Sequence, residues 1–178
     1  MKSKSSLFIF GIIAGVINII GWWVFHLMFD NDPNQMDFDQ GEIIGYTAMI
    51  ISFTMVFFGI KYYRDKQQDG IITFKNAFLN GLVIVLVASV IYVIGWELYY
   101  PSFKEEFATQ YEAHLLAEYK AEGLSDKEIS EKKAEMDQWM ENYENPFIRI
   151  GITFMEIFPV GLIISLFSAL ILKKKPAT

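Results

Sequence analysis

Four long apolar segments, almost free of charged residues, limit what this chain can fold into. They cover residues of about 7–29, 43–60, 77–99 and 147–172. Each segment is apolar on all sides instead of on one helical face, so lipid is its expected solvent. At a rise of 1.5 Å per residue, about 20 residues cross a hydrocarbon core about 30 Å thick. The sequence therefore predicts an all-α membrane protein with four transmembrane helices in one membrane domain, residues 1–178.

The first segment also resembles a secretory signal peptide, because Lys2 and Lys4 precede an apolar run. That run is longer than a normal signal core, and no small-x-small cleavage site follows it. We expect a retained anchor.

Lysine and arginine are distributed unevenly between the spans. Nine of them lie in three short segments: Lys2, Lys4, Lys61, Arg64, Lys66, Lys75, Lys173, Lys174 and Lys175. The segment after the first span has five acidic residues and no lysine or arginine, and residues 101–146 have twelve acidic residues against five lysines. The positive-inside rule then places both termini in the cytoplasm.

Residues of about 102–144 carry a helical pattern between the third and fourth spans. Two apolar stripes occur at helical spacing: Phe103, Phe107, Tyr111 and Leu115, then Ile129, Met136, Met140 and Tyr143. Gly123 favours a left-handed helix cap between them, and Ser125 with Glu128 has the pattern of a capping box. We expect an extracytoplasmic helical hairpin that packs on itself and on the helix ends, or that also binds a partner.

Two blocks resemble an uncharacterised family of bacterial four-helix membrane proteins, domain-of-unknown-function family 4199. The first is Asp69-Gly70-Ile71-Ile72-Thr73-Phe74-Lys75-Asn76-Ala77-Phe78 followed by Gly81, and the second is Asn145-Pro146 followed by residues 154–162, FMEIFPVGL. The resemblance implies the same topology, in a bacterial inner (cytoplasmic) membrane, and supplies no activity.

Glu156 is the most informative polar residue in the spans, because a charge at the bilayer centre costs about 2.5–3.5 kcal/mol. Pro159 follows it and cannot donate to the carbonyl of Met155, which leaves a polar patch beside the carboxyl. Glu156 is a candidate protonatable or cation-binding site, or a neutral group hydrogen-bonded between helices.

Asn18 and Tyr92 fall at a similar depth to Glu156, judged from the helical rise. The three side chains could form one interhelical polar cluster, since membrane helices associate through such groups. Near the outer ends of their spans, Glu97 and Arg149 could form an ion pair, or each could snorkel to water.

Small residues form stripes on three spans: Gly11 and Gly15, then Gly81, Ala88 and Gly95, then Gly161, Ser165 and Ala169. They predict close helix packing. Besides the lipid bilayer, the expected partners are a protein or a second copy, bound through the outer hairpin or these small-residue faces.

Composition excludes several functions. The chain has no cysteine and only two histidines, which argues against a metal centre, and a net charge of −6 argues against nucleic-acid binding. No catalytic constellation or cofactor motif is visible. We expect a non-enzymatic scaffold or accessory subunit of a membrane process; the alternative is a small transporter or ion-conducting bundle that uses an intramembrane carboxyl.

Overall fold

The computed structural model describes residues 4–29 and 38–174. They form α-helices in the order α1 (Ser5–Phe29), α2 (Phe38–Gln67), α3 (Phe74–Ala121), α4 (Asp126–Glu144) and α5 (Pro146–Leu172). Four stretches are long and apolar enough to span a membrane: Ser5–Val24, Ile43–Gln67, Phe74–Ser102 and Pro146–Leu172. The predicted all-α membrane architecture with four spans is confirmed.

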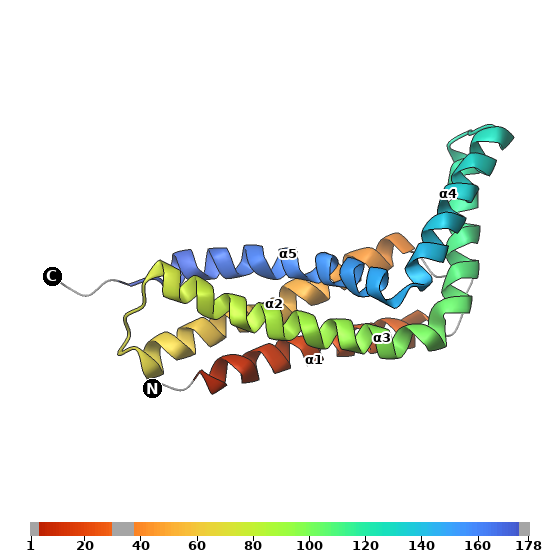
Figure 1. The fold of residues 1–178 in the computed structure, drawn as a ribbon. Helices are drawn as coiled ribbons and strands as arrows, with labels where there is room; N and C mark the ends of the chain where they lie inside the picture. The colour runs from red at the N-terminus through yellow and green to blue at the C-terminus, as the bar shows by residue number, and fades with distance from the viewer. Residues whose placement is uncertain (1–3, 30–37, 175–178) are drawn as a thin grey trace.

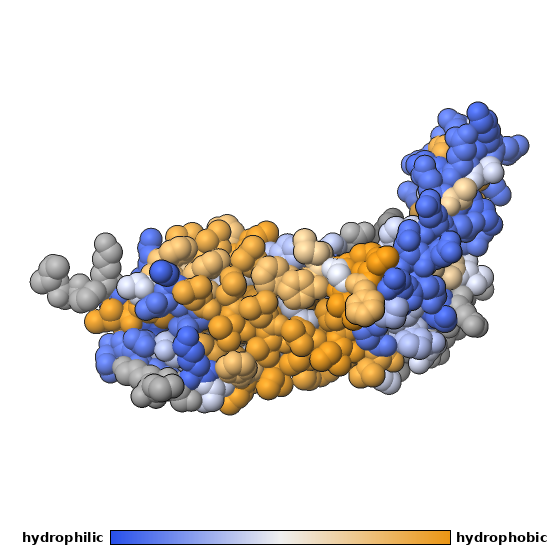
Figure 2. Space-filling model, in the orientation of Figure 1, coloured by the Kyte–Doolittle hydropathy of each residue, from blue (hydrophilic) through white to orange (hydrophobic). Residues whose placement is uncertain are grey.

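The spans form one elongated bundle, and the end of α3 projects from it together with α4 (Figure 1). The visible surface of the bundle is apolar along its middle and hydrophilic at both ends, whereas the projecting part is almost entirely hydrophilic (Figure 2). Such an apolar surface is what lipid requires, since hydrocarbon cannot solvate polar groups. We call the end with the projection the arm end, and the opposite end, which contains Lys61, Arg64, Lys66, Lys75 and Lys173, the basic end.

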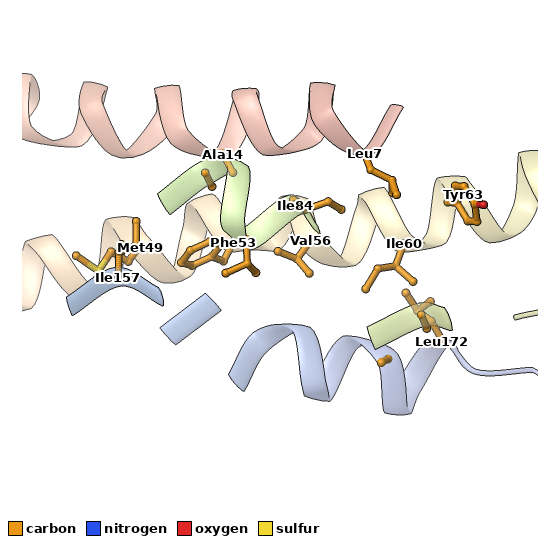
Figure 3. Packing of buried hydrophobic residues seen from close by; sticks show 14 of the residues in the cluster. Leu7, Ala14, Met49, Phe53, Val56, Ile60, Tyr63, Ile84, Ile157 and Leu172 are labelled. Carbon is orange, nitrogen blue, oxygen red and sulfur yellow. The ribbon is translucent and has the colours of Figure 1, made fainter. Parts of the chain in front are cut away.

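The bundle interior is built from aliphatic and aromatic side chains of all four spans. Phe53 and Ile60 of α2, Ile84 of α3 and Ile157 of α5 are fully buried, and Figure 3 shows them among the residues directed into the space between the helices. Gly11 lets α1 approach α3 closely, because a Cβ there would lie 2.6 Å from the Cβ of Val87. Packing of this kind drives helix association in lipid, where a hydrophobic driving force between helices is lacking.

Several glycines of the predicted small-residue stripes pack against other helices of the same chain. Gly15 lies against Ile91 of α3, and Gly161 of α5 lies against Val85 and Phe53. These positions of the small-residue faces are covered by neighbouring helices of the same protomer.

The helix of the third span, expected at about residues 77–99, continues through Pro101 into the segment expected to form the hairpin. α3 is a single helix of 48 residues with Pro101 inside it. Proline removes the hydrogen bond to the carbonyl four residues earlier, that of Glu97, and bends a helix without necessarily ending it. α3 changes direction where it leaves the bundle (Figure 1). We define the arm as the part of α3 beyond Pro101 together with α4.

A tight turn joins the two helices of the arm. Gly123 has a φ of 79°, the left-handed conformation that glycine adopts without steric cost. Ser125 then caps α4 in a capping box with Glu128. Lys133 of α4 forms an ion pair with Glu112 of α3. The side chains of Phe103 and Phe107, part of the predicted apolar stripe, lie outside the described residues.

The basic end is closed by a contact between segments distant in sequence. The backbone N–H of Ile72 donates to the carbonyl of Lys174 at 3.1 Å, and the N–H of Lys174 donates back at 2.8 Å. Arg64 also donates to the carbonyl of Leu172 at 3.2 Å. The connection between α2 and α3 therefore holds the last residues of α5.

Candidate functional site

The most highly connected polar site lies at the arm end, where α3, α4 and α5 meet. Arg149, in the first turn of α5, makes a two-pronged ion pair with Glu97 of α3: Nε to Oε1 at 2.8 Å and Nη2 to Oε2 at 2.7 Å. The Arg149 side chain is 7% exposed and that of Glu97 is 22% exposed. Because the planar guanidinium matches a carboxylate in two parallel hydrogen bonds, this pair fixes orientation as well as charge.

The remaining surface of the guanidinium is also covered. Its Nη1 donates to the carbonyl of Tyr143, the last turn of α4, at 3.0 Å. The ring of Tyr100 lies 4.2 Å from the guanidinium carbon, a cation–π contact. A single side chain of α5 thus holds both α3 and α4.

Tyr143 is the second centre of this site. Its hydroxyl accepts from Nε1 of Trp96 at 2.8 Å, and its ring stacks on Trp139 with centroids 5.0 Å apart. Burial is the main cause that raises the pKa of the Tyr143 hydroxyl above its ordinary value, so the group stays neutral and can act as a hydrogen-bond partner.

Glu144 connects the base of the arm in the same way. Its Oε1 accepts from the Tyr100 hydroxyl at 3.1 Å, and its Oε2 accepts from Lys104 at 3.2 Å. Tyr100 and Lys104 lie on either side of Pro101, so these contacts support α3 on both sides of its proline. We name Glu97, Tyr100, Tyr143, Glu144 and Arg149 the arm clamp.

Sequence reasoning selected Glu97 and Arg149 for this site but missed the rest. Trp96 and Tyr100 lie at the end of the third predicted span, and Tyr143 was visible only as the end of an apolar stripe. Only their positions could have indicated them. All three lie near the predicted helix ends, at the boundary between membrane and water, where a side chain with an apolar ring and a polar end group is favoured.

The three residues of the predicted intramembrane cluster divide between two helix pairs. Asn18 is buried, and its side-chain amide donates to Ser52 of α2 at 2.7 Å and to the carbonyl of Ala14 at 3.2 Å. Tyr92 of α3 is also buried, and its hydroxyl interacts with the carboxyl of Glu156 on α5. Asn18 therefore joins α1 to α2, whereas Tyr92 and Glu156 join α3 to α5.

Glu156 is exposed on the surface of α5, although its depth is that of the middle of the span. Within residues 4–29 and 38–174, no three side chains of His, Asp or Glu are grouped so that they could hold a metal ion. The arrangement at the arm end is suited to holding helices in place by charge-assisted hydrogen bonds.

Four apolar spans and a clamped hydrophilic arm define the chain as a multi-pass integral membrane protein. Residues 9–174 match the family described as Protein of unknown function (DUF4199), and the chain belongs to that family. No curated protein and no solved structure matches it. The family assignment predicted from the two sequence blocks is confirmed.

Proposed function

We propose that the protein is a non-enzymatic scaffold or accessory subunit of a membrane process, and that the arm is the surface through which it contacts a partner protein. The observation that supports this most is the arm clamp. A two-pronged ion pair with a buried arginine, together with its aromatic surroundings, holds the base of the arm to the bundle. A segment held in this way loses little conformational entropy when a partner binds, which favours affinity.

The surface chemistry of the arm suggests the kind of partner. Residues 101–146 contain twelve acidic residues and five lysines, so a basic surface would be attracted to the arm. Trp139 lies on α4 and is 45% exposed. Tryptophan is among the residues that most often dominate the binding energy of protein interfaces.

The proposed location is a bacterial inner membrane, with both termini in the cytoplasm and the arm on the opposite face. The lysines and arginines of the basic end support this orientation through the positive-inside rule. An extracytoplasmic arm would meet secreted or membrane-anchored partners.

Photo-crosslinking in the native host tests the proposal. A photoreactive phenylalanine analogue at Trp139 or at exposed Glu131 should give a discrete crosslinked product with another protein, whereas the same analogue at exposed Lys66 of the basic end is the control. Equal products from all three sites, or none from the arm, would contradict a specific role for the arm.

The second candidate function is a small transporter or ion-conducting bundle that uses Glu156. It would require this carboxyl to line a pathway, and Glu156 is exposed on α5 instead of enclosed by the bundle. A pathway would then have to form against another helix. Loss of a pH-dependent flux in proteoliposomes on Glu156→Gln, with the fold retained, would favour the transporter over the scaffold.

A further inference from the structure

Polar side chains line one half of the contact between α3 and α5. Each helix contributes three of them, spaced at three and four residues: Ser89, Tyr92 and Trp96 on α3, and Arg149, Thr153 and Glu156 on α5. Residues with this spacing lie on one face of a helix. The two helices run side by side in opposite directions (Figure 1), and Tyr92 lies against Glu156. We call these six residues the polar seam.

Hydroxyl groups connect the arm end of the seam with the middle of the membrane. The Tyr143 hydroxyl of α4, which accepts from Trp96, also lies beside the hydroxyl of Thr153. Thr153 and Glu156 are three residues apart and are therefore neighbours on α5. The hydroxyl of Tyr92 reaches the same carboxyl from α3. Glu156 itself lies about 15 Å along α5 from its start, near the middle of the hydrocarbon core.

Two hydroxyls of the seam are buried without a hydrogen bond of regular geometry to any group that the structure describes. They belong to Ser89, which is fully buried, and to Thr153, which is 2% exposed. Buried hydroxyls that lack a partner are costly and rare. Because a hydroxyl has one donor and two acceptor sites, each can accept a hydrogen bond from one side and donate one to the other, as a proton relay requires.

The other half of the same contact, towards the basic end, has no polar side chain. Residues 81–88 of α3 and 157–164 of α5 are all apolar or glycine, over about 12 Å of each helix. The packing is also tight, since a Cβ added at Gly161 would lie 2.5 Å from Val85 and 2.7 Å from Phe53. The polar groups therefore lead from the arm end to Glu156, and a closely packed apolar barrier separates Glu156 from the basic end.

The charged and titratable groups around Glu156 leave a proton as its available counter-charge. Tyr92 of α3 and Tyr143 of α4 are the titratable side chains close enough to feel its charge. The span of α2, which also packs against α5, has no charged residue between positions 43 and 60 and one titratable residue, Tyr46. On α5, Arg149 lies seven residues away and is already paired with a carboxylate. An ionised carboxyl at this depth is costly.

We propose that Glu156 is a proton-binding site in the middle of the membrane, and that it exchanges its proton with the arm side alone, through the polar seam. Each hydroxyl accepts a proton from the direction of the arm and passes its own proton inward. The carboxylate gains one proton, every hydroxyl keeps one hydrogen, and no electrons are transferred. A site open to one side binds and releases protons but conducts none, so the proposal differs from the ion-conducting alternative and does not depend on a partner of the arm.

Charge displacement after a pH jump tests the site. A proton that moves from the surface to the middle of the membrane crosses part of the electric field, so its uptake gives a transient current without a steady current. Phosphatidylcholine proteoliposomes with the arm outside can be isolated through biotinylated Ala121→Cys, and those with the basic end outside through Lys66→Cys, because the chain has no native cysteine.

An external pH jump should give the transient current when the arm is outside and little current when the basic end is outside. Equal transients in the two preparations would overturn the one-sided access. A steady current would overturn the closed barrier, and no transient with the arm outside would overturn the proton-binding site itself.

Four substitutions test the route in proteoliposomes with the arm outside. Glu156→Gln keeps size and hydrogen bonding but cannot ionise, and it should abolish the transient. Thr153→Val removes one hydroxyl at nearly constant size and should slow the transient by about a hundredfold, the lower end of what a positioned proton-transfer group contributes. Tyr143→Phe tests the entrance of the seam from another helix, should also slow the transient, and decides the test if Thr153→Val fails to fold.

Thr54→Val is the matched control, since Thr54 is exposed on α2 outside the seam, and it should leave the transient unchanged. A transient that survives Glu156→Gln would overturn the proposal. Thr153→Val and Tyr143→Phe proteins that are both as fast as Thr54→Val would overturn the route through the seam.

Discussion

The ion pair between Glu97 and Arg149 shows how one residue can determine the geometry of several helices. Arg149 contacts a carboxylate on α3, a backbone carbonyl of α4 and an aromatic ring in a single position. Taking such a charge out of water is costly, and the cost is recovered only while all partners are present. The ion pair alone therefore adds little to the free energy of unfolding, but it strongly determines how α3, α4 and α5 are oriented relative to one another.

Substitutions in this pair should be strongly non-additive. Glu97→Leu leaves the guanidinium of Arg149 buried without its carboxylate, and we expect it to reduce the free energy of unfolding by about 3 kcal/mol. The double substitution with Arg149→Leu should recover a large part of that loss, because no buried charge remains. Thermal unfolding in detergent measures both, and a double variant as unstable as the sum of the single ones would show that the two residues are not coupled and would contradict this prediction.

For the polar residues inside the spans, the sequence predicts depth in the membrane but not the contacts of the side chains. Helical rise gives the depth of Asn18, Tyr92 and Glu156, but depth does not specify which helices are neighbours or which way a side chain points. Asn18 bonds to Ser52 of α2, and Ser52 carries no distinguishing pattern in the sequence. A partner of this kind is determined by the order and rotation of the helices in the bundle.

At the scale of elements, apolar patterning predicted the spans better than their ends. The second span was expected at residues 43–60, and the helix that contains it runs from Phe38 to Gln67. Hydropathy identifies the residues that lie in the hydrocarbon core. The helix itself can extend beyond the core into the headgroup region, where polar residues can continue the helical hydrogen bonding. The same reason explains why α3 passes through Pro101, where polar helix-forming residues follow.

Helix packing at this scale can be tested with two glycines. Gly11→Ala places a Cβ 2.6 Å from the Cβ of Val87 and 2.9 Å from the carbonyl oxygen of Ile84, so α1 must move away from α3. We expect a loss of about 1–3 kcal/mol in the free energy of unfolding. Gly45→Ala is the control, since no atom lies within 4 Å of its added Cβ, and it should be neutral or slightly stabilising. Similar losses in both would rule out close packing as the role of Gly11.

The cap of α4 should make the arm sensitive to acid. The backbone N–H and hydroxyl of Ser125 donate to the Glu128 carboxylate at 2.8 Å and 2.7 Å, and these bonds lower the pKa of Glu128 below its ordinary value of 4.5. A lowered pKa means that the folded arm binds this proton less readily than the unfolded arm. The stabilisation is therefore complete above the ordinary pKa and is lost as the pH falls through the lower, folded value.

Hydrogen exchange of the first-turn amides of α4 measures this effect. Their protection should decrease in acid in the native chain, and the decrease should be much smaller in Glu128→Gln, which cannot ionise. An identical acid response in the two proteins would assign it to other carboxyls of the arm.

At the scale of the whole molecule, the distribution of lysine and arginine predicts which side of the membrane each end of the bundle faces. A cysteine at Ala121, in the arm, should react with an impermeant maleimide in cells whose outer envelope is permeable. A cysteine at Gln67, at the basic end, should react only after the cytoplasmic membrane is broken. The reverse pattern would place the arm in the cytoplasm and would change the kind of partner it can meet.

The arm clamp also has a consequence for the order in which the chain is made. Glu97 and Arg149 are 52 residues apart, so during synthesis the third span emerges from the ribosome well before the arginine that balances its carboxylate. With the proposed orientation, the arm crosses the membrane before the fourth span enters it. We therefore expect a nascent chain that stops before Arg149 to insert its third span incompletely or to recruit a chaperone, and insertion of the last helix to be the step that completes biogenesis.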